Sequence, residues 1–284
     1  MISKRPTTNY QRITIASWLN QATVSLKKVG INSARLDAQL LLEDTLSKSR
    51  QWILARDETE VENADLITLN KKLVQRIEHT PLAYIVGYKE FYGRKFIVDK
   101  NVLIPRPESE AIIELLCTIM HTQAESIDTI VDIGTGSGIL AITAKLEYPD
   151  LKVIATDVSS KALGVAQKNA AILQAEVKFI KSDLFSSISD LQPSVLLVNL
   201  PYVPDDLVTS EEITKEPPEA LFSGEDGLDH YRKFWDQIAG LKNKPKYIIT
   251  ESLESQHEDM TDLARYANYS FETSNTLIQL FRKV

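Results

Sequence analysis

Asp132-Ile133-Gly134-Thr135-Gly136-Ser137-Gly138 is the stretch of this chain that decides its fold. It closes an apolar run, residues 129–133, and precedes a segment with helical character. Glycines at such a turn let the backbone approach a ligand closely at the N-terminus of a helix. The dinucleotide pattern Gly-x-Gly-x-x-Gly would need glycine where Ile139 stands, and no Lys-Ser or Lys-Thr pair of a phosphate-binding loop follows. The stretch predicts a ligand loop of another kind in an α/β sheet, with a purely structural glycine turn as the alternative.

Apolar runs and helical segments alternate from Asp128 onward, as an α/β sheet requires. The expected strands cover residues 129–133, 152–157, 176–180, 195–199 and 247–251, and the expected helices cover residues 138–147, 159–173 and 227–241. The last two apolar runs, residues 269–273 and 277–282, have no helix between them and therefore predict an antiparallel hairpin. The pattern predicts an α/β fold with a Rossmann-like sheet that ends in this hairpin.

Residues 1–80 predict a small all-helical domain, because apolar residues recur there at helical spacing and Pro81 closes the last periodic segment. Residues 91–98 and 102–104 have the character of two strands around Asp99-Lys100-Asn101. We therefore expect three parts. They are a helical substrate-docking domain over residues 1–80, a β-hairpin linker over residues 81–105 and a catalytic domain over residues 106–284.

Composition narrows the class of protein. Of 284 residues, 43% are apolar and 25% charged, which is typical of a globular domain. Residues 1–80 hold 12 Lys and Arg against 9 Asp and Glu, whereas the remainder holds 20 against 30. This acidic balance argues against direct nucleic-acid binding, and no run of about 18 apolar residues predicts a membrane span. Since Cys117 is the single cysteine, a disulfide framework is excluded. We expect a cytoplasmic monomer without membrane contact.

Asn199-Leu200-Pro201-Tyr202 is the most informative feature for function, and it follows the apolar residues 195–198. An Asn-x-Pro-Tyr loop after a buried strand can hold a planar N–H donor group with two neutral acceptors. These acceptors are the side-chain oxygen of Asn199 and the backbone carbonyl of Leu200. A methyltransferase needs this arrangement to alkylate an amide or an exocyclic amine nitrogen. Together with the glycine loop, the tetrapeptide indicates N-methylation that depends on S-adenosylmethionine.

Two acidic residues follow neighbouring expected strands. Asp157 ends the second strand and is placed to accept both ribose hydroxyls of a nucleoside, while Asp183 follows the third and can accept an adenine amino group. Leu184 is available to cover the adenine ring. The predicted S-adenosylmethionine site therefore comprises Gly134, Thr135, Gly136, Ser137, Gly138, Asp157, Asp183, Leu184 and Asn199. We expect no metal, and we interpret His79, His121, His230 and His257 as surface or structural residues.

These motifs resemble the HemK/PrmC family, whose members methylate the side-chain N5 of a glutamine in class I peptide chain release factors. Residues 80–87, 91–93, 102–110, 132–138, 183–185, 216–217 and 224–228 match the family's blocks in order. The specific block is Ile104-Pro105-Arg106-Pro107-Glu108, which nucleic-acid enzymes of the class generally lack. The chain departs from the family's pattern at three positions: Leu200 replaces a proline, Leu184 replaces a frequent tryptophan, and no glycine follows Glu251.

The resemblance implies that the substrate is the glutamine of a Gly-Gly-Gln motif. A glutamine nitrogen is a poor nucleophile because its lone pair is delocalised into the carbonyl. Accepting both of its N–H groups, at Asn199 and at the Leu200 carbonyl, fixes the nitrogen and stabilises positive charge that develops on it. We expect Asn199, Pro201 and Tyr202 to be catalytic, with Asn199, Leu200, Pro201 and Tyr202 binding the substrate. Tyr202 would pack on the planar amide, and no strong general base is needed.

Two other functions fit parts of the pattern. Asn-Leu-Pro-Tyr also resembles the tetrapeptide of rRNA adenine dimethylases, so an adenine-N6 methyltransferase on RNA or DNA is the first alternative. The sequence pI of about 5.3 argues against it. A non-catalytic scaffold that binds S-adenosylmethionine is the second alternative, although every residue that the chemistry needs is present.

Overall fold

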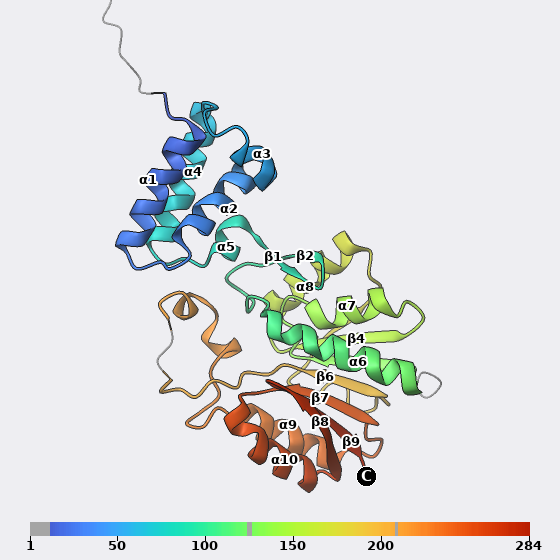
Figure 1. Cartoon of the computed structure of the whole chain (residues 1–284). Helices are drawn as coiled ribbons and strands as arrows, with labels where there is room; N and C mark the ends of the chain where they lie inside the picture. The colour runs from blue at the N-terminus through green and yellow to red at the C-terminus, as the bar shows by residue number, and fades with distance from the viewer. Residues whose placement is uncertain (1–11, 124–126, 208–209) are drawn as a thin grey trace, which may run out of the picture. The chain divides into compact units, whose positions relative to one another are not determined.

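The structure is a computed structural model that describes residues 12–123, 127–207 and 210–284, and it divides into two compact units between Val86 and Gly87 (Figure 1). The expected helical domain is therefore extended by the short helix α5 (Leu82–Val86). The expected linker over residues 81–105 is divided, because its hairpin belongs to the second unit. Within the described ranges, no helix is both long and apolar enough to cross a membrane.

The first unit is all-helical, as predicted. Its remaining helices are α1 (Ile15–Lys28), α2 (Ala34–Leu46), α3 (Arg50–Leu54) and α4 (Asn63–Ile77). Helix α1 begins where the Thr14 hydroxyl accepts a hydrogen bond from the backbone N–H of Ser17 at 3.2 Å. Ser33 precedes α2 as its N-cap residue but makes no side-chain capping bond. Apolar faces of α1, α2 and α4 form one core, which includes Trp18, Leu41 and Leu69.

A hairpin opens the second unit, in a different register from the expected one. Strands β1 (Tyr88–Phe91) and β2 (Arg94–Ile97) pair antiparallel around Tyr92-Gly93, and residues 102–104 form no strand. Tyr92 and Gly93 have φ values of 49° and 71°, as a two-residue turn of the favoured hand requires. The register is fixed because the side chains of Phe91 and Phe96 are 1% and 0% exposed in the core of the unit.

The main sheet has seven strands, ordered β5-β4-β3-β6-β7-β9-β8. The strands β3 (Thr129–Ile133), β4 (Lys152–Asp157), β5 (Lys178–Lys181), β6 (Val195–Val198) and β7 (Tyr247–Glu251) run parallel. The strands β8 (Tyr269–Asn275) and β9 (Ile278–Lys283) form an antiparallel hairpin that joins the sheet at β7. The predicted Rossmann-like sheet with its C-terminal hairpin is confirmed.

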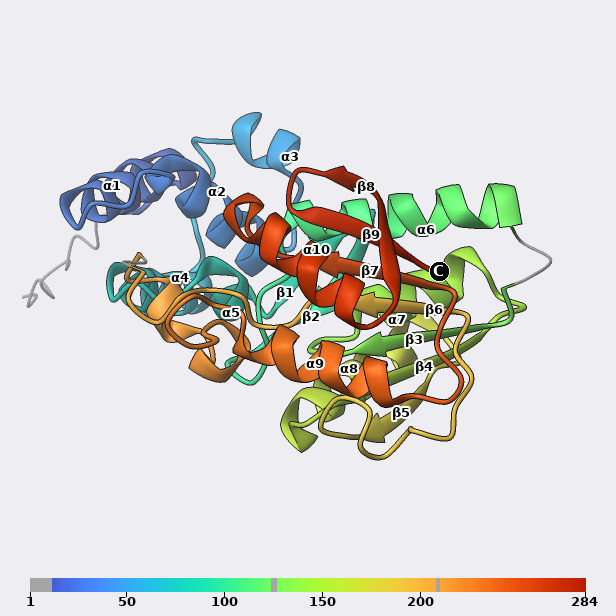
Figure 2. The same ribbon diagram turned by 90° about the horizontal axis from the view of Figure 1, so that it is seen from below.

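Helices cover both faces of this sheet (Figure 2). The unit contains α6 (Glu110–Gln123), α7 (Ile139–Glu147), α8 (Ser160–Leu173), α9 (Asp229–Gly240) and α10 (His257–Tyr266). Alternate strand residues divide the apolar side chains into two clusters, as the two-residue period of a strand requires. Helices α6 and α7 pack on one cluster, and α9 and α10 pack on the other. The sheet is therefore the middle of three layers.

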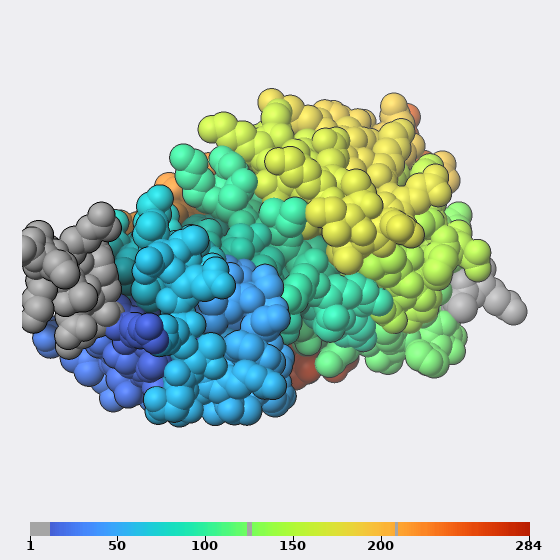
Figure 3. All heavy atoms as spheres, turned by 90° about the horizontal axis from the view of Figure 1, so that it is seen from above, coloured from blue at the N-terminus to red at the C-terminus, as the bar shows by residue number. Residues whose placement is uncertain are grey.

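The hairpin β1–β2 lies against helix α8, and their atoms adjoin in the space-filling view (Figure 3). The contact is specific, because Asn169 on α8 accepts a hydrogen bond from the backbone N–H of Ile97 at 2.7 Å and donates one to its carbonyl at 3.0 Å. A further bond runs from Asn169 to the carbonyl of Ser137 at 2.8 Å. The side chain of Asn169 thus ties the hairpin to the glycine loop.

Candidate active site

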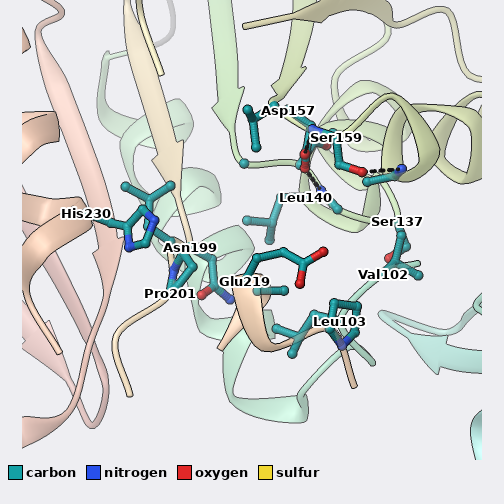
Figure 4. A pocket seen from close by; sticks show the side chains of 18 of the residues that line it. Val102, Leu103, Ser137, Leu140, Asp157, Ser159, Asn199, Pro201, Glu219 and His230 are labelled. Atoms are coloured by element: carbon teal, nitrogen blue, oxygen red, sulfur yellow. Dashed lines mark hydrogen bonds between the residues drawn. The ribbon is translucent and has the colours of Figure 1, made fainter. Parts of the chain in front are cut away.

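A cavity of about 470 Å³ opens at the carboxyl ends of β3, β4 and β6 (Figure 4). Parallel α/β sheets bind their ligands at this edge. Most of the residues predicted from the sequence line it: Gly134, Thr135, Gly136, Ser137, Asp157, Asp183, Leu184, Asn199, Leu200 and Pro201. Gly138 and Tyr202 are absent from the lining. The structure thus brings the glycine loop, the two acids and most of the tetrapeptide together.

The glycine loop is shaped for a ligand at one position and for helix packing at another. A Cβ atom on Gly136 would meet nothing within 4 Å, so this part of the backbone is open to a molecule in the cavity. A Cβ on Gly138 would instead lie 2.8 Å from Ile142 and 3.1 Å from Ala166. Gly138 therefore serves the close packing of α7 and α8. Below the loop, the buried Asp132 accepts hydrogen bonds from the Thr135 hydroxyl at 2.6 Å and the Ala141 N–H at 3.1 Å.

Asp157 is held firmly at the edge of the cavity. Its carboxylate accepts hydrogen bonds from the backbone N–H groups of Gly136 at 2.9 Å and Ser159 at 2.8 Å. Burial raises its pKa, while these hydrogen bonds oppose the change. A partly buried carboxylate fixed in this way can accept hydrogen bonds from a vicinal diol.

The wall beside Asp157, where β5 ends, is more exposed. Asp183 forms an ion pair with Lys233 of α9, and both side chains are 52% exposed. The Leu184 side chain next to it is buried. His230 also lines the cavity, and its Nδ1 is 2.7 Å from the Ser223 hydroxyl. Burial lowers the pKa of His230, which favours the neutral imidazole. His230, which we interpreted from the sequence as a surface or structural residue, thus lies in the wall of the cavity.

Asn199 is oriented by a network that the sequence did not reveal. Its Nδ2 donates to the Ser109 hydroxyl at 3.1 Å and to Glu251 Oε2 at 3.0 Å. Ser109 donates its own proton to the same Glu251 oxygen at 2.6 Å. Among the residues that the structure describes, none donates a hydrogen bond to Oδ1 of Asn199. This oxygen is therefore left to accept one from a ligand beside Pro201 (Figure 4).

Tyr202 lies behind the cavity and not along it. Its hydroxyl donates to Glu251 Oε1 at 2.9 Å, and its backbone carbonyl accepts a hydrogen bond from Gln256 Nε2 at 2.9 Å. Gly227 packs so closely here that a Cβ on it would lie 2.2 Å from the Tyr202 carbonyl oxygen. The structure thus shows Tyr202 anchoring the tetrapeptide. The expected packing of its ring on a substrate amide stays a prediction.

The block around Arg106 forms the wall beside Asn199. The buried Glu216 accepts a hydrogen bond from the Ile104 N–H at 2.9 Å and forms an ion pair with Arg106. Pro105, Arg106 and Ser109 line the cavity from this side, together with Pro217 and Glu219. The pair between Glu216 and Arg106 therefore joins two segments about 110 residues apart into one wall.

Comparisons with known proteins agree with this architecture. Residues 17–87 match the PrmC N-terminal domain family, and residues 111–224 match the methyltransferase small domain family. The release factor glutamine methyltransferase of Koribacter versatilis is 36% identical over 80% of this chain and 81% of its own length. That of Bacillus cereus is 34% identical over 81% and 83%. The chain belongs to the release factor glutamine methyltransferase family, also called HemK/PrmC.

Two further comparisons bear on this family member. A bifunctional methyltransferase of Rickettsia felis is 30% identical over 90% of this chain, but the chain spans only 54% of that protein. The chain thus covers about half the length of such relatives. Among solved structures, the hMettl16 catalytic domain in complex with a MAT2A 3'UTR hairpin has a TM-score of 0.52. It covers 78% of this chain and 82% of its own at 12% identity, which shows a shared fold only.

Sequence reasoning on this family member missed three side chains at the site: Ser109, His230 and Glu251. Glu251 had the clearest sign, because it ends the last parallel strand, at the same edge as Asp157 and Asn199. Ser109 ends a short 3-10 helix and His230 lies in the first turn of α9, and only the tertiary structure reveals that both approach the cavity. The described residues hold no group of three or more His, Cys, Asp and Glu that could bind a metal ion.

Proposed function

We propose that this chain transfers a methyl group from S-adenosylmethionine to the side-chain N5 of the glutamine in the Gly-Gly-Gln motif of class I peptide chain release factors. The orientation of Asn199 is the observation that carries the proposal. Its Nδ2 faces two acceptors, Glu251 and Ser109, so that the acceptor oxygen Oδ1 is left for the substrate. An N–H group is the partner that such an oxygen selects.

The cavity fits S-adenosylmethionine as the donor. The open side of Gly136 suits the close approach of a ligand to the backbone, and Asp157 suits the ribose hydroxyls. Asp183 and Leu184 would hold the adenine end, and residues 134–137 would hold the amino-acid end. When bound, S-adenosylmethionine supplies a sulfonium-activated methyl group, which needs no metal for its transfer.

The substrate amide would lie between Asn199 and Leu200. Their two oxygens, the side-chain Oδ1 and the backbone carbonyl, would each accept one N–H of the glutamine. Both acceptors are neutral and fixed before the substrate arrives, which stabilises charge developing on nitrogen without a reorganisation cost. Pro201 restricts the loop between them because its ring fixes φ. Tyr202 would complete the site through its tie to Glu251.

We also propose that the helical unit docks the release factor. It has its own hydrophobic core, it matches the PrmC N-terminal domain family, and its sequence is the basic part of an acidic chain. The enzyme would act as a monomer in the cytoplasm, where translation takes place, and would not bind nucleic acid directly. A chain that lacks residues 1–86 would then show a raised KM for the whole factor but not for a Gly-Gly-Gln peptide. Equal losses on both substrates would contradict the docking role.

The direct test is methyl transfer to purified substrates, followed by peptide mass spectrometry. We expect one methyl group on the glutamine of the release factor, and none on a Gly-Gly-Ala variant of the factor. Ribosomal RNA serves as the competing substrate. Methyl transfer to adenine in RNA, with none to the factor, would overturn the proposal in favour of an adenine-N6 methyltransferase. Binding of S-adenosylmethionine without transfer to either would favour the scaffold alternative.

A further inference from the structure

Two segments that lie far apart in the sequence converge on the buried carboxylate of a third. Glu251, at the end of β7, is 1% exposed and does not line the cavity. It accepts hydrogen bonds from Ser109, Asn199 and Tyr202, at 2.6, 3.0 and 2.9 Å. Two of the three donors belong to the tetrapeptide, and the third belongs to the block that forms the cavity wall. None of the three donors is positively charged, so the carboxylate is not held here as one half of an ion pair.

We infer that Glu251, together with Ser109, is a positioning residue that fixes which end of the Asn199 amide faces the cavity. The inference deepens the proposed function and rests on it, because it concerns the acceptor for the substrate N–H. Neither side chain would touch the glutamine. Their effect would pass through Asn199.

The chemistry of the groups gives the direction of the amide. An asparagine amide has an accepting end and a donating end of nearly the same size, so shape alone does not distinguish the two orientations. Burial raises the pKa of Glu251, while the hydrogen bonds that it accepts from Ser109, Tyr202 and Asn199 oppose this and favour the ionised form, which only accepts hydrogen bonds. Glu251 therefore faces Nδ2 of Asn199 and repels Oδ1.

Ser109 reinforces the same direction. Its single proton is donated to Glu251, and the hydroxyl oxygen is then free only to accept. Nδ2 of Asn199 thus faces two acceptors, and Oδ1 is the end left for the cavity. A reversed amide would present N–H groups to the N–H groups of the substrate and an oxygen to the carboxylate.

Exchanging the amide of Asn199 with the carboxylate of Glu251 provides the sharpest test. In Glu251→Gln the amide can turn, so Asn199 loses its fixed direction. In Asn199→Asp two carboxylates face each other. The double variant Asn199→Asp/Glu251→Gln restores a donor opposite an acceptor, keeps the net charge of the wild type, and still presents an oxygen to the cavity. The glutamine introduced by Glu251→Gln can also keep its side-chain oxygen toward the Tyr202 hydroxyl.

We would measure the single-turnover rate on the release factor, the KM for the release factor, the Kd for S-adenosylhomocysteine and the Tm of each variant. We expect each single variant to lose about 10- to 100-fold in rate, the range for a misplaced or missing preorganised group. The double variant should recover about tenfold or more over Asn199→Asp. For Glu251→Gln, the Kd should stay near the wild-type value, since Glu251 does not line the cavity.

Two serines provide a matched pair of controls. Ser109→Ala removes one acceptor and should lower kcat several-fold with little change in KM for the factor. Ser252→Ala removes a buried hydroxyl next to Glu251 that has no hydrogen-bond partner within the described residues. It should keep the wild-type rate.

The outcomes separate the inference from the proposed function. A wild-type rate in Glu251→Gln would overturn the inference alone. So would a double variant that regains its Tm but not its rate, because the contacts would then serve only the stability of the fold. A wild-type chain that leaves the release factor unmethylated would overturn the proposed function, and this inference with it.

Discussion

Gly227→Ala should lower the rate of methyl transfer by displacing Tyr202, although Gly227 does not line the cavity. Its φ of +79° alone costs an alanine about 1–2 kcal/mol. Its Cβ would also lie 2.2 Å from the Tyr202 carbonyl oxygen and 2.6 Å from Gln256 Nε2. That oxygen must move, and loss of its hydrogen bond from Gln256 adds about 1 kcal/mol. We expect a total loss of about 2–3 kcal/mol in unfolding free energy, with a displaced tetrapeptide.

Gly93→Ala is the matched control for this substitution. Gly93 has a similar φ of +71°, but its Cβ would meet nothing within 4 Å. Urea unfolding and single-turnover methyl transfer, measured on both variants, then separate backbone strain from the clash. We expect Gly93→Ala to lose about 1–2 kcal/mol and to keep its rate, whereas Gly227→Ala loses rate at least about tenfold. If both variants had the same stability and the same rate, the anchoring of Tyr202 by its neighbours would be refuted.

Four further substitutions test other parts of the site. Asp157→Ala should weaken binding of S-adenosylhomocysteine by about 1–3 kcal/mol in calorimetry, and the exposed Asp183→Ala should weaken it less; the reverse order would contradict the ribose assignment. Leu200→Pro should keep the rate of methyl transfer, since the backbone carbonyl remains. It should lose about 1–3 kcal/mol of unfolding free energy, because a buried side chain and an N–H bonded to Tyr231 are removed. A rate loss as large as that of Asn199→Ala would contradict the backbone role of Leu200. Burial raises the pKa of Asp132 from 3.8 to about 7, so the folded protein binds this proton more tightly than the unfolded chain does. The free energy of unfolding should therefore fall as the pH rises from about 4 to about 7, by at most ~1.4 kcal/mol per pH unit. Asp132→Asn should flatten this slope in Tm against pH, and an unchanged slope would show that the group titrates normally.

The sheet was predictable because its strands are buried on both faces. Residues 195–198 are all buried, and such continuous apolar runs are typical of central parallel strands. Helix α10 was not predicted, because its sequence is largely polar and only Met260 and Ala264 are buried in it. The register of the first hairpin was wrong for a different reason. Its turn at Tyr92-Gly93 lies inside what looks like one continuous strand.

The cavity-lining residues Gly134, Asp157, Asp183 and Asn199 were also predictable, since each ends or follows a strand whose carboxyl end lies at the same edge of the sheet. The hydrogen bonds that hold Asn199 and Tyr202 in place were not predictable. Ser109 and Glu251 are 142 residues apart, and their contact depends on how the start of α6 packs against β7. Leu200 illustrates a mixed case. Its backbone role follows from the motif, whereas the burial of its side chain becomes visible only in the folded chain.

Single-turnover methyl transfer to a purified release factor, with S-adenosylmethionine saturating, tests the central claim most directly when wild type and Asn199→Ala are compared. We propose Asn199 Oδ1 as the acceptor on which the recognition of the substrate amide depends. Its removal should reduce transition-state stabilisation by about 2–4 kcal/mol, while cofactor affinity changes little. A wild-type rate in a folded Asn199→Ala variant would mean that the tetrapeptide is a structural turn and that the active site lies elsewhere.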